Sequence, residues 1–221
     1  TSKTFRSRGS ARTVLPNGVA LNTLHGRPYR KNVSIERIVN HWQMARDFSR
    51  RAGLEERPDI VVCAWPTIDF AHAARHYCRS RDVPLVLDVR DMWPEIFLEA
   101  FPHSMDGIAR TLLRPIFRRA QSTLRAADGV VAISSAAVDW ACEFSGRTRS
   151  EAWDRAFHLS YRSSGLADAE RESAAEFWRS RGVSGLSERK VVCFFGAMTN
   201  RIQLQPVIEA ARCLARRGRD D

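Results

Sequence analysis

The chain has 221 residues, of which 44% are hydrophobic, and its formal charge at pH 7 is +10. This composition suits a globular protein of one full domain and a remainder, or of two small domains, and no apolar run approaches the roughly 20 residues of a membrane-spanning helix. A basic chain fits phosphorylated substrates, an anionic membrane surface or nucleic acid. The charge is almost all arginine, dispersed along amphipathic segments. We therefore expect most of the arginines to form the solvent-exposed polar faces of helices. A role in binding an anionic membrane surface is the second possibility, and we do not expect binding to nucleic acid.

Helix-like and strand-like segments alternate along the chain. Residues 1–12 are rich in Ser, Arg and Gly and are expected to be frayed. Ser34 is predicted to cap the first helix, and Ser134 or Ser135 a later one. Pro115 should kink its helix or mark the true beginning. The predicted strands lie at residues 18–24, 59–64, 83–87, 129–133, 156–160 and 190–195, and the predicted helices at 34–51, 70–77, 108–125, 135–144, 174–182 and 205–216. This alternation predicts an α/β fold with a doubly wound parallel sheet.

The cysteines are widely spaced and form no CxxC pair. An odd number at such spacing is typical of a protein in a reducing compartment, and it predicts neither disulfides nor zinc ligands. Cys63 and Cys193 fall inside predicted buried strands, so we expect both to be small core residues. The five cysteines are Cys63, Cys78, Cys142, Cys193 and Cys213.

Residues 84–97, PLVLDVRDMWPEIF, are the stretch around which the chain is organised. The apolar run over 85–87 predicts a strand buried on both faces of a parallel sheet. Charged residues follow at once, at Asp88, Arg90 and Asp91. Because α/β folds bind ligands at the carboxyl ends of their strands, this pattern predicts a binding or catalytic site. The alternative is an Asp-rich loop that only caps the next helix.

A second candidate site follows the predicted strand at 190–195. Gly196 and Ala197 leave the loop open, and the next helix offers free backbone N–H groups and the positive end of its dipole. Arg201 could add a cation to a bound diphosphate. The alternative is an ordinary turn between a strand and a helix.

Several well-known motifs are absent from the sequence. It has no GxGxxG fingerprint, no P-loop, no HExxH pair and no GxSxG elbow. His72 and His76 lie four residues apart on one predicted helix, but no acidic or cysteine partner is evident, so we expect no metal site there.

Much of the chain resembles the amino-terminal domain of family 4 glycosyltransferases of the GT-B fold. The resemblance rests on RPDIVVCAWPTIDFAHAA from Arg57, VPLVLDVRDMWPEIF from Val83 and ADGVVAISSAAVDW from Ala127. Upstream, RPYRKNVSIERIVNH from Arg27 is similar to the acceptor-side loop and helix of these enzymes. Downstream, KVVCFFGAMTNRIQLQPVIEAARCL from Lys190 resembles the first βα unit of their nucleotide-sugar domain.

The resemblance implies two Rossmann-like domains facing a cleft, one holding an acceptor and the other a UDP- or GDP-linked sugar. It implies a hexosyltransferase that retains anomeric configuration, uses no metal or other cofactor, and builds polysaccharides or glycolipids. The acceptor would be a glycan or a lipid-linked molecule. The implied location is cytoplasmic, at the inner face of the cell membrane, where a basic chain would meet an anionic surface.

The resemblance also assigns candidate site residues. Arg90 stands where many relatives carry a cleft histidine, and Asp91 matches the acid that follows, so these two are the catalytic candidates. Trp93 is the one tryptophan for which a role in the cleft is weighed equally with core packing. The acceptor-binding candidates are Trp93, Glu95, Pro66, Thr67 and Tyr29. The donor-binding candidates are Gly196, Ala197 and Arg201.

By the same resemblance, residues 1–160 form the acceptor-side domain, 161–188 a linker with a helix, and 189–221 the start of the nucleotide-sugar domain. The first strand of one domain and the paired glutamates of the other are not in the sequence, so we expect this chain alone to be inactive. Two alternatives stay open: a sugar-nucleotide epimerase of the same fold, and a basic α/β module that binds nucleic acid or a protein partner without catalysis.

Overall fold

The computed structural model describes residues 11–30, 34–160, 165–183, 191–196 and 202–218. The chain divides into two compact units, Thr1–Ser160 and Tyr161–Asp221, and each is described by itself.

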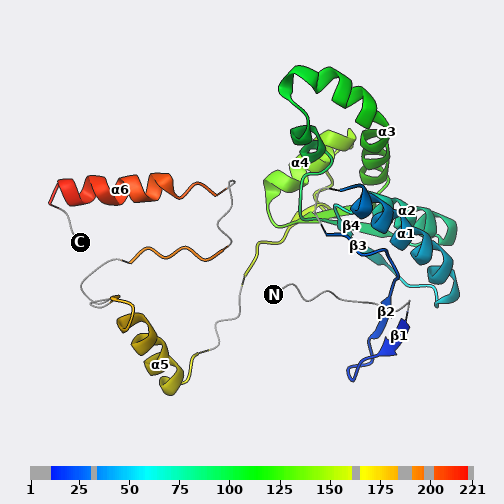
Figure 1. The fold of residues 1–221 in the computed structure, drawn as a ribbon. Coiled ribbons are helices and arrows are strands. Elements are labelled where there is room, and N and C mark those ends of the chain that lie inside the picture. Colours follow the sequence, from blue (N-terminus) through cyan, green and yellow to red (C-terminus); the bar gives the residue numbers. More distant parts are fainter. Residues whose placement is uncertain (1–10, 31–33, 161–164, 184–190, 197–201, 219–221) are drawn as a thin grey trace. The chain divides into compact units, whose positions relative to one another are not determined.

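The first unit is built on a four-stranded parallel sheet with the strand order β3-β4-β5-β6. Its strands are β3 (Val61–Trp65), β4 (Leu85–Val89), β5 (Gly129–Ala132) and β6 (Arg155–Ala156). Helices connect them in turn (Figure 1): α2 (Ile68–Arg81), α3 (Asp106–Arg125) and α4 (Ser135–Ser145). The predicted α/β class with a parallel sheet is confirmed.

The helices gather on one face of this sheet. Consecutive strands that are neighbours, joined by crossovers of the same right-handed sense, place their connecting helices on the same side. Accordingly Leu85, Leu87 and Val89 are buried, whereas Val62 on the other face is 64% exposed. The sequence predicted burial on both faces for residues 85–87. This is corrected, because Val86 and Asp88 are only half-buried.

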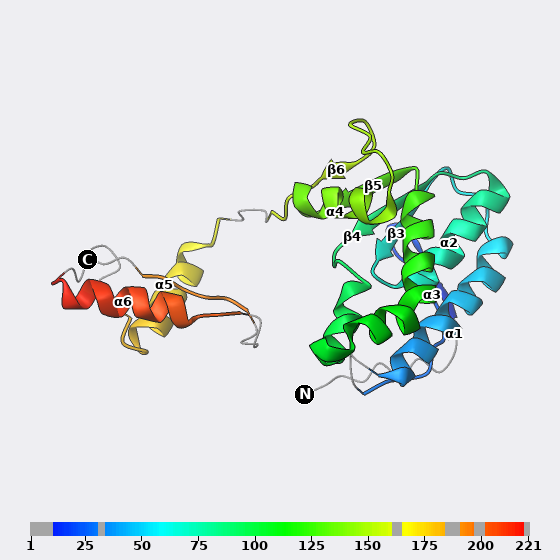
Figure 2. The same ribbon diagram turned by 90° about the horizontal axis from the view of Figure 1, so that it is seen from above.

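The core lies between the sheet and the row of helices. Helix α1 (Ile35–Arg51) packs against α2, α2 against α3, and α3 against α4, and Figure 2 shows the first three side by side. Trp65, Leu124 and Val138 are fully buried there. Each large apolar side chain taken out of water contributes about 1.5–3 kcal/mol, so this packing is the main stabilising term.

Two helix beginnings follow the predicted capping. Ser34 Oγ accepts a hydrogen bond from the backbone N–H of Arg37 at 3.2 Å. Ser134 Oγ accepts one from Ala137 N–H at 3.3 Å, which decides between the two predicted caps of α4. Each bond satisfies a backbone donor that the first turn of a helix leaves open.

Helix α3 continues through Pro115 and does not begin there. Two short 3-10 helices, η2 (Glu95–Ala100) and η3 (His103–Met105), lead into it from the loop after β4. The helix changes direction along its length in both views, as expected when a proline removes one backbone hydrogen bond from a helix interior (Figures 1 and 2).

A separate antiparallel hairpin precedes α1. Strand β1 (Ala11–Val14) pairs with β2 (Ala20–Thr23), so the predicted strand over 18–24 is confirmed within a few residues. The expectation that residues 1–12 are frayed is wrong for the last two of them, because Ala11 and Arg12 belong to β1. Residues 1–10 lie outside the described ranges.

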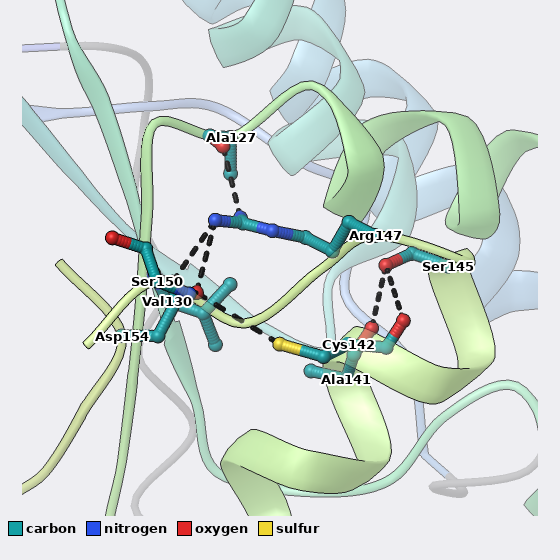
Figure 3. Close-up of polar contacts among 8 residues, drawn as sticks. All are labelled: Ala127, Val130, Ala141, Cys142, Ser145, Arg147, Ser150 and Asp154. Atoms are coloured by element: carbon teal, nitrogen blue, oxygen red, sulfur yellow. Dashed lines mark hydrogen bonds and ion pairs between the residues drawn. The ribbon is translucent and has the colours of Figure 1, made fainter.

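A buried ion pair fastens the start of β6 (Figure 3). Asp154 Oδ1 accepts a hydrogen bond from Val130 N–H at 2.8 Å, and its Oδ2 accepts one from Ser150 N–H at 2.7 Å. Arg147 Nη2 lies 3.1 Å from both carboxylate oxygens. The Asp154 side chain is fully buried and the Arg147 side chain is 11% exposed. Every oxygen of this carboxylate therefore has partners, as a buried charge requires.

The second unit contains two described helices, α5 (Asp168–Arg179) and α6 (Gln205–Arg216). Helix α6 has the predicted bounds, whereas α5 begins six residues before the predicted start and ends three residues before the predicted end. The strand predicted over 190–195 does not form in residues 191–195, where Val192 and Phe195 are each 82% exposed. A strand needs a neighbour for its backbone hydrogen bonds, and none pairs with this segment among the described residues. Cys193 is consequently exposed and not a core residue, whereas Cys63 is buried as predicted.

Candidate functional site

The carboxyl edge of the parallel sheet brings together the segments that follow its strands. Thr67 comes after β3, Arg90 after β4, Ser134 after β5 and His158 after β6. His158 Nδ1 lies 3.1 Å from the carbonyl oxygen of Ile133, which ties the segment after β6 to the end of β5. All four segments therefore open onto the same edge, where parallel sheets place ligands.

Arg90 pairs with Asp88 and not with Asp91. The Nε and Nη2 atoms of Arg90 both lie 2.8 Å from Asp88 Oδ2, and the arginine side chain remains 66% exposed. Asp88 occupies the exposed face of the sheet, in register with Ala64 and Val131. This contact fixes the guanidinium at the carboxyl edge while leaving it open to solvent. Asp91 is also exposed.

Glu95 combines a bonded oxygen with an unbonded one. Its Oε1 accepts a hydrogen bond from the indole Nε1 of Trp140 at 3.2 Å. Its Oε2 is buried, and no group in the described part of the chain forms a hydrogen bond with it. A buried polar atom without a hydrogen-bond partner is unusual in proteins, and the indole Nε1 of Trp65 is another such atom among the described residues. The hydrogen bond from Trp140 to Glu95 is a contact that the sequence did not predict.

Tyr29 and Trp93 are linked through Arg37, a residue that no sequence pattern indicated. The guanidinium carbon of Arg37 lies 5.7 Å from the ring centroid of Tyr29 and 5.0 Å from that of Trp93. Arg37 Nε donates a hydrogen bond to His41 Nε2 at 3.3 Å. Burial, and then the charge of Arg37, lower the pKa of His41 below its ordinary value, which favours the neutral imidazole.

A groove of about 360 Å³ lies next to these residues, within the roughly 300–1,000 Å³ usual for small-molecule sites. Pro66 and Trp93, two of the predicted acceptor-binding residues, line it together. Thr67, Glu95 and Arg90 do not. The lining residues come from α1, the loops after β3 and β4, α2 and α3: Ile38, Val39, His41, Trp42, Pro66, Ile68, Asp69, Trp93, Phe97, Pro115, Ile116 and Arg119.

The remaining predicted residues are only partly described. Thr67 occupies the N-cap position of α2, but its side chain makes no capping bond. Gly196 lies exposed in the second unit. Ala197 and Arg201 fall outside the described residues, so the predicted donor site is described at one residue alone.

Metal ligands do not cluster in the part of the chain that the structure describes, since no three His, Cys, Asp or Glu side chains lie close enough to hold an ion. His72 and His76 do meet, with their Nε2 atoms 3.1 Å apart, while His72 Nδ1 lies 3.2 Å from Thr123 Oγ1. Burial and the neighbouring His76, Arg119 and Arg75 lower the pKa of His72.

Comparison with protein families assigns the first unit. The model of the glycosyl transferase 4-like domain matches residues 6–152, which is more than half of the chain. The chain belongs to the glycosyl transferase 4-like domain family. A comparison with curated proteins gives no significant match.

Family membership bears on the site just described. The matched region contains all the segments at the carboxyl edge through β5, together with the groove and the Tyr29–Arg37–Trp93 contacts. A glycosyltransferase binds a sugar donor and an acceptor, so two kinds of ligand belong to this family in general. The match ends before the second unit, which holds the predicted donor residues.

Proposed function

We propose that this glycosyl transferase 4-like chain takes part in transferring a hexose from a UDP- or GDP-linked donor to a glycan or lipid-linked acceptor. The observation that carries the proposal is the carboxyl edge of the sheet. There a fixed but exposed guanidinium and a buried, unpartnered carboxylate oxygen lie on one short loop. Retention of anomeric configuration and a role in polysaccharide or glycolipid synthesis are part of the proposal.

Arg90 and Asp91 supply complementary charges. A guanidinium forms paired hydrogen bonds with phosphate or with neighbouring sugar hydroxyls, and it keeps its charge at any working pH. The contact with Asp88 limits the movement of Arg90, so less entropy is lost when a ligand binds. Asp91, one residue further along the loop, offers a hydrogen-bond acceptor to a sugar hydroxyl.

Glu95 supplies the second recognition element. Trp140 holds one carboxylate oxygen in place, and the other oxygen is buried without a hydrogen-bond partner among the described residues. A sugar hydroxyl that donates to Glu95 Oε2 would satisfy this buried atom. Such a bond to a charged group contributes about 1.5–3 kcal/mol.

The donor nucleotide is proposed to bind in the second unit, near Gly196, Ala197 and Arg201, through backbone N–H groups and the arginine cation. No metal or other cofactor is part of this proposal, because the arginines carry the positive charge that a diphosphate needs. We place the protein in the cytoplasm, at the inner face of the cell membrane. Within the described residues, none of the helices has the length and apolar character to cross a bilayer.

The test uses the full-length protein with UDP- and GDP-hexoses and a panel of glycan and lipid-linked acceptors. Arg90→Ala should lower kcat/KM by about 10²–10³, the usual effect of removing one preorganised donor from a transition-state site. Arg79→Ala, which removes an exposed arginine in the last turn of α2, is the matched control. Equal activity of the two variants would contradict the role of Arg90. Absence of sugar transfer with every donor would contradict the proposed function.

A further inference from the structure

The groove beside Trp93 has an apolar character that a sugar alone does not explain. Most of its lining is aliphatic, aromatic or proline, as at Ile38, Trp42 and Ile116. Two of its polar residues, Asp69 and Arg119, form an ion pair with each other. Sugars are recognised by hydrogen bonds to their hydroxyls, and a site lined in this way offers few of them.

Apolar surface continues from the groove to the outside of the protein. Ile38 and Trp42, which line it, are 50% and 51% exposed. On α3, Ile108 and Leu112 are 64% and 66% exposed and precede the lining residue Ile116 at intervals of four, so the three follow one stripe of the helix. Exposed apolar side chains that lead into an apolar groove indicate a ligand with a hydrocarbon part.

Positive charge lies at the same place. Arg37 stacks on Trp93 where the groove meets the carboxyl edge, and Arg46 lies 5.4 Å from the ring centroid of Trp42 at the exposed side. An apolar channel bordered by arginines is complementary to an amphiphile whose hydrocarbon chain carries a phosphate.

We propose that the groove binds the hydrocarbon chain of a phosphate-bearing lipid acceptor, with the phosphate toward Arg37 and Trp93. This inference rests on the proposed function and narrows its acceptor to the lipid-linked class. The hydrocarbon chain of the lipid enters the groove past Ile38 and Trp42. The reacting end of the acceptor then lies at the carboxyl edge of the sheet. There it is close to the loop that carries Arg90 and Glu95.

The first experiment measures binding of octyl, decyl and dodecyl phosphate to the full-length protein by calorimetry, each below its critical micelle concentration. Burying one methylene group tightens binding about fourfold, so affinity should rise by roughly tenfold or more with each added pair of methylenes. An affinity that does not depend on chain length would overturn the proposal.

Two matched variants locate the effect. Ile38→Glu places a carboxylate at the mouth of the groove and should remove most of the dependence on chain length. Leu54→Glu makes the same change at a leucine that is 85% exposed and does not line the groove, and it should leave the dependence intact. Both sites are exposed, so neither variant should impair folding. The proposal would be overturned if the affinity of Ile38→Glu still depended on alkyl chain length, or if this dependence disappeared equally in Ile38→Glu and Leu54→Glu.

Experiments with vesicles of anionic phospholipid and with a soluble acceptor distinguish three alternatives: docking on a membrane surface, lipid binding without sugar transfer, and transfer to an acceptor without a lipid. If Ile38→Glu weakens vesicle binding but not binding of the monomeric alkyl phosphates, the surface docks on a membrane and the groove proposal is overturned. If the groove binds alkyl phosphates as expected but no sugar is transferred to any acceptor, the proposed function fails and the binding site stands. Transfer to a chain-free glycan as fast as to its alkyl-phosphate derivative would leave the function standing and overturn the lipid acceptor.

Discussion

The two edges of the parallel sheet differ in how completely their polar groups are satisfied. At the amino edge, Asp128 Oδ2 accepts a hydrogen bond from Leu85 N–H and Asp154 Oδ1 accepts one from Val130 N–H, both at 2.8 Å. Asp154 also pairs with the nearly buried Arg147. These carboxylates therefore fasten strand beginnings and have little left to offer a ligand.

The carboxyl edge shows the opposite arrangement. Arg90 is held by one carboxylate yet stays exposed, and Glu95 Oε2 is buried without a hydrogen-bond partner in the described residues. The comparison teaches that charge alone does not mark a functional site, because both edges carry Arg–Asp pairs. What distinguishes the two edges is hydrogen-bonding capacity that the protein leaves unused.

The largest expected effect on stability lies at the amino edge. Asp154→Ala leaves Arg147 with a nearly buried, unpaired charge and two backbone N–H groups without acceptors. The free energy of unfolding should fall by about 3–5 kcal/mol. Asp139→Ala, which breaks the exposed pair with Arg149, should lower it by less than about 1 kcal/mol. Urea unfolding followed by circular dichroism measures both, and similar losses would remove the distinction between buried and exposed pairs.

The next effect concerns binding at the carboxyl edge. Glu95→Gln keeps an oxygen for Trp140 but replaces the carboxylate that a sugar hydroxyl would meet. Affinity for the acceptor should drop by about 10- to 100-fold, in line with roughly 1.5–3 kcal/mol for a hydrogen bond to a charged group. Stability should change by less than about 1 kcal/mol, because the amide oxygen of Gln can still accept the hydrogen bond from Trp140 and no ion pair of Glu95 is broken among the described residues. Calorimetric titration and urea unfolding give the two values, and a large stability loss with unchanged affinity would make Glu95 structural.

Thiol labelling extends the comparison to the cysteines. Burial, and then Asp154, raise the pKa of Cys142, and burial raises the pKa of Cys63 to about 12. At about pH 8 the exposed Cys193 and Cys213 should react with a thiol reagent at once, while these buried thiols stay protonated and inaccessible. In Asp154→Ala, Cys142 should become reactive while Cys63 stays protected. Mass spectrometry of the labelled peptides measures which cysteines have reacted. Simultaneous labelling of Cys142 and Cys63 would mean that the whole first unit unfolds, and not only the region around Asp154.

The smallest expected effect is a pH dependence of the free energy of unfolding that arises from His41, which lines the groove. Burial and the charge of Arg37 lower the pKa of His41, so the folded protein binds fewer protons there than the unfolded chain. Stability from this group is present above the unfolded pKa and is lost as the pH falls below it. The free energy of unfolding should therefore decrease from about pH 7 to pH 5, and less so in His41→Gln. Identical slopes for the two proteins would contradict a role of His41.

Local patterns in the sequence were sufficient for most of the fold. The caps at Ser34 and Ser134 and the strands around Val61 and Leu85 are set by neighbours in the chain, so periodicity and capping rules place them. The segment 191–195 has the same apolar pattern as a buried strand. It forms none because a strand depends on a partner, and local pattern contains no information about partners.

The position of the candidate site in the fold could be predicted from the sequence, but the contacts between its side chains could not. The end of β4 marks the loop that carries Arg90 and Glu95, and the rule for parallel sheets was enough to find it. The hydrogen bond from Trp140 to Glu95 joins residues that are distant in sequence, and Arg37 reaches the ring of Trp93 from helix α1. Such contacts follow from packing in three dimensions, which neither spacing nor composition encodes.

Among the described residues, strand β3 lies at the edge of its sheet, and Ile60 just before it and Val62 within it are 48% and 64% exposed. An outermost strand presents N–H and C=O groups that a strand of another molecule can bond, and exposed β-branched side chains make that association more favourable. An open edge of this kind favours self-association as the protein concentration rises. A lysine in place of Val62 should keep it monodisperse, because repeated like charges would then oppose alignment of the two edges.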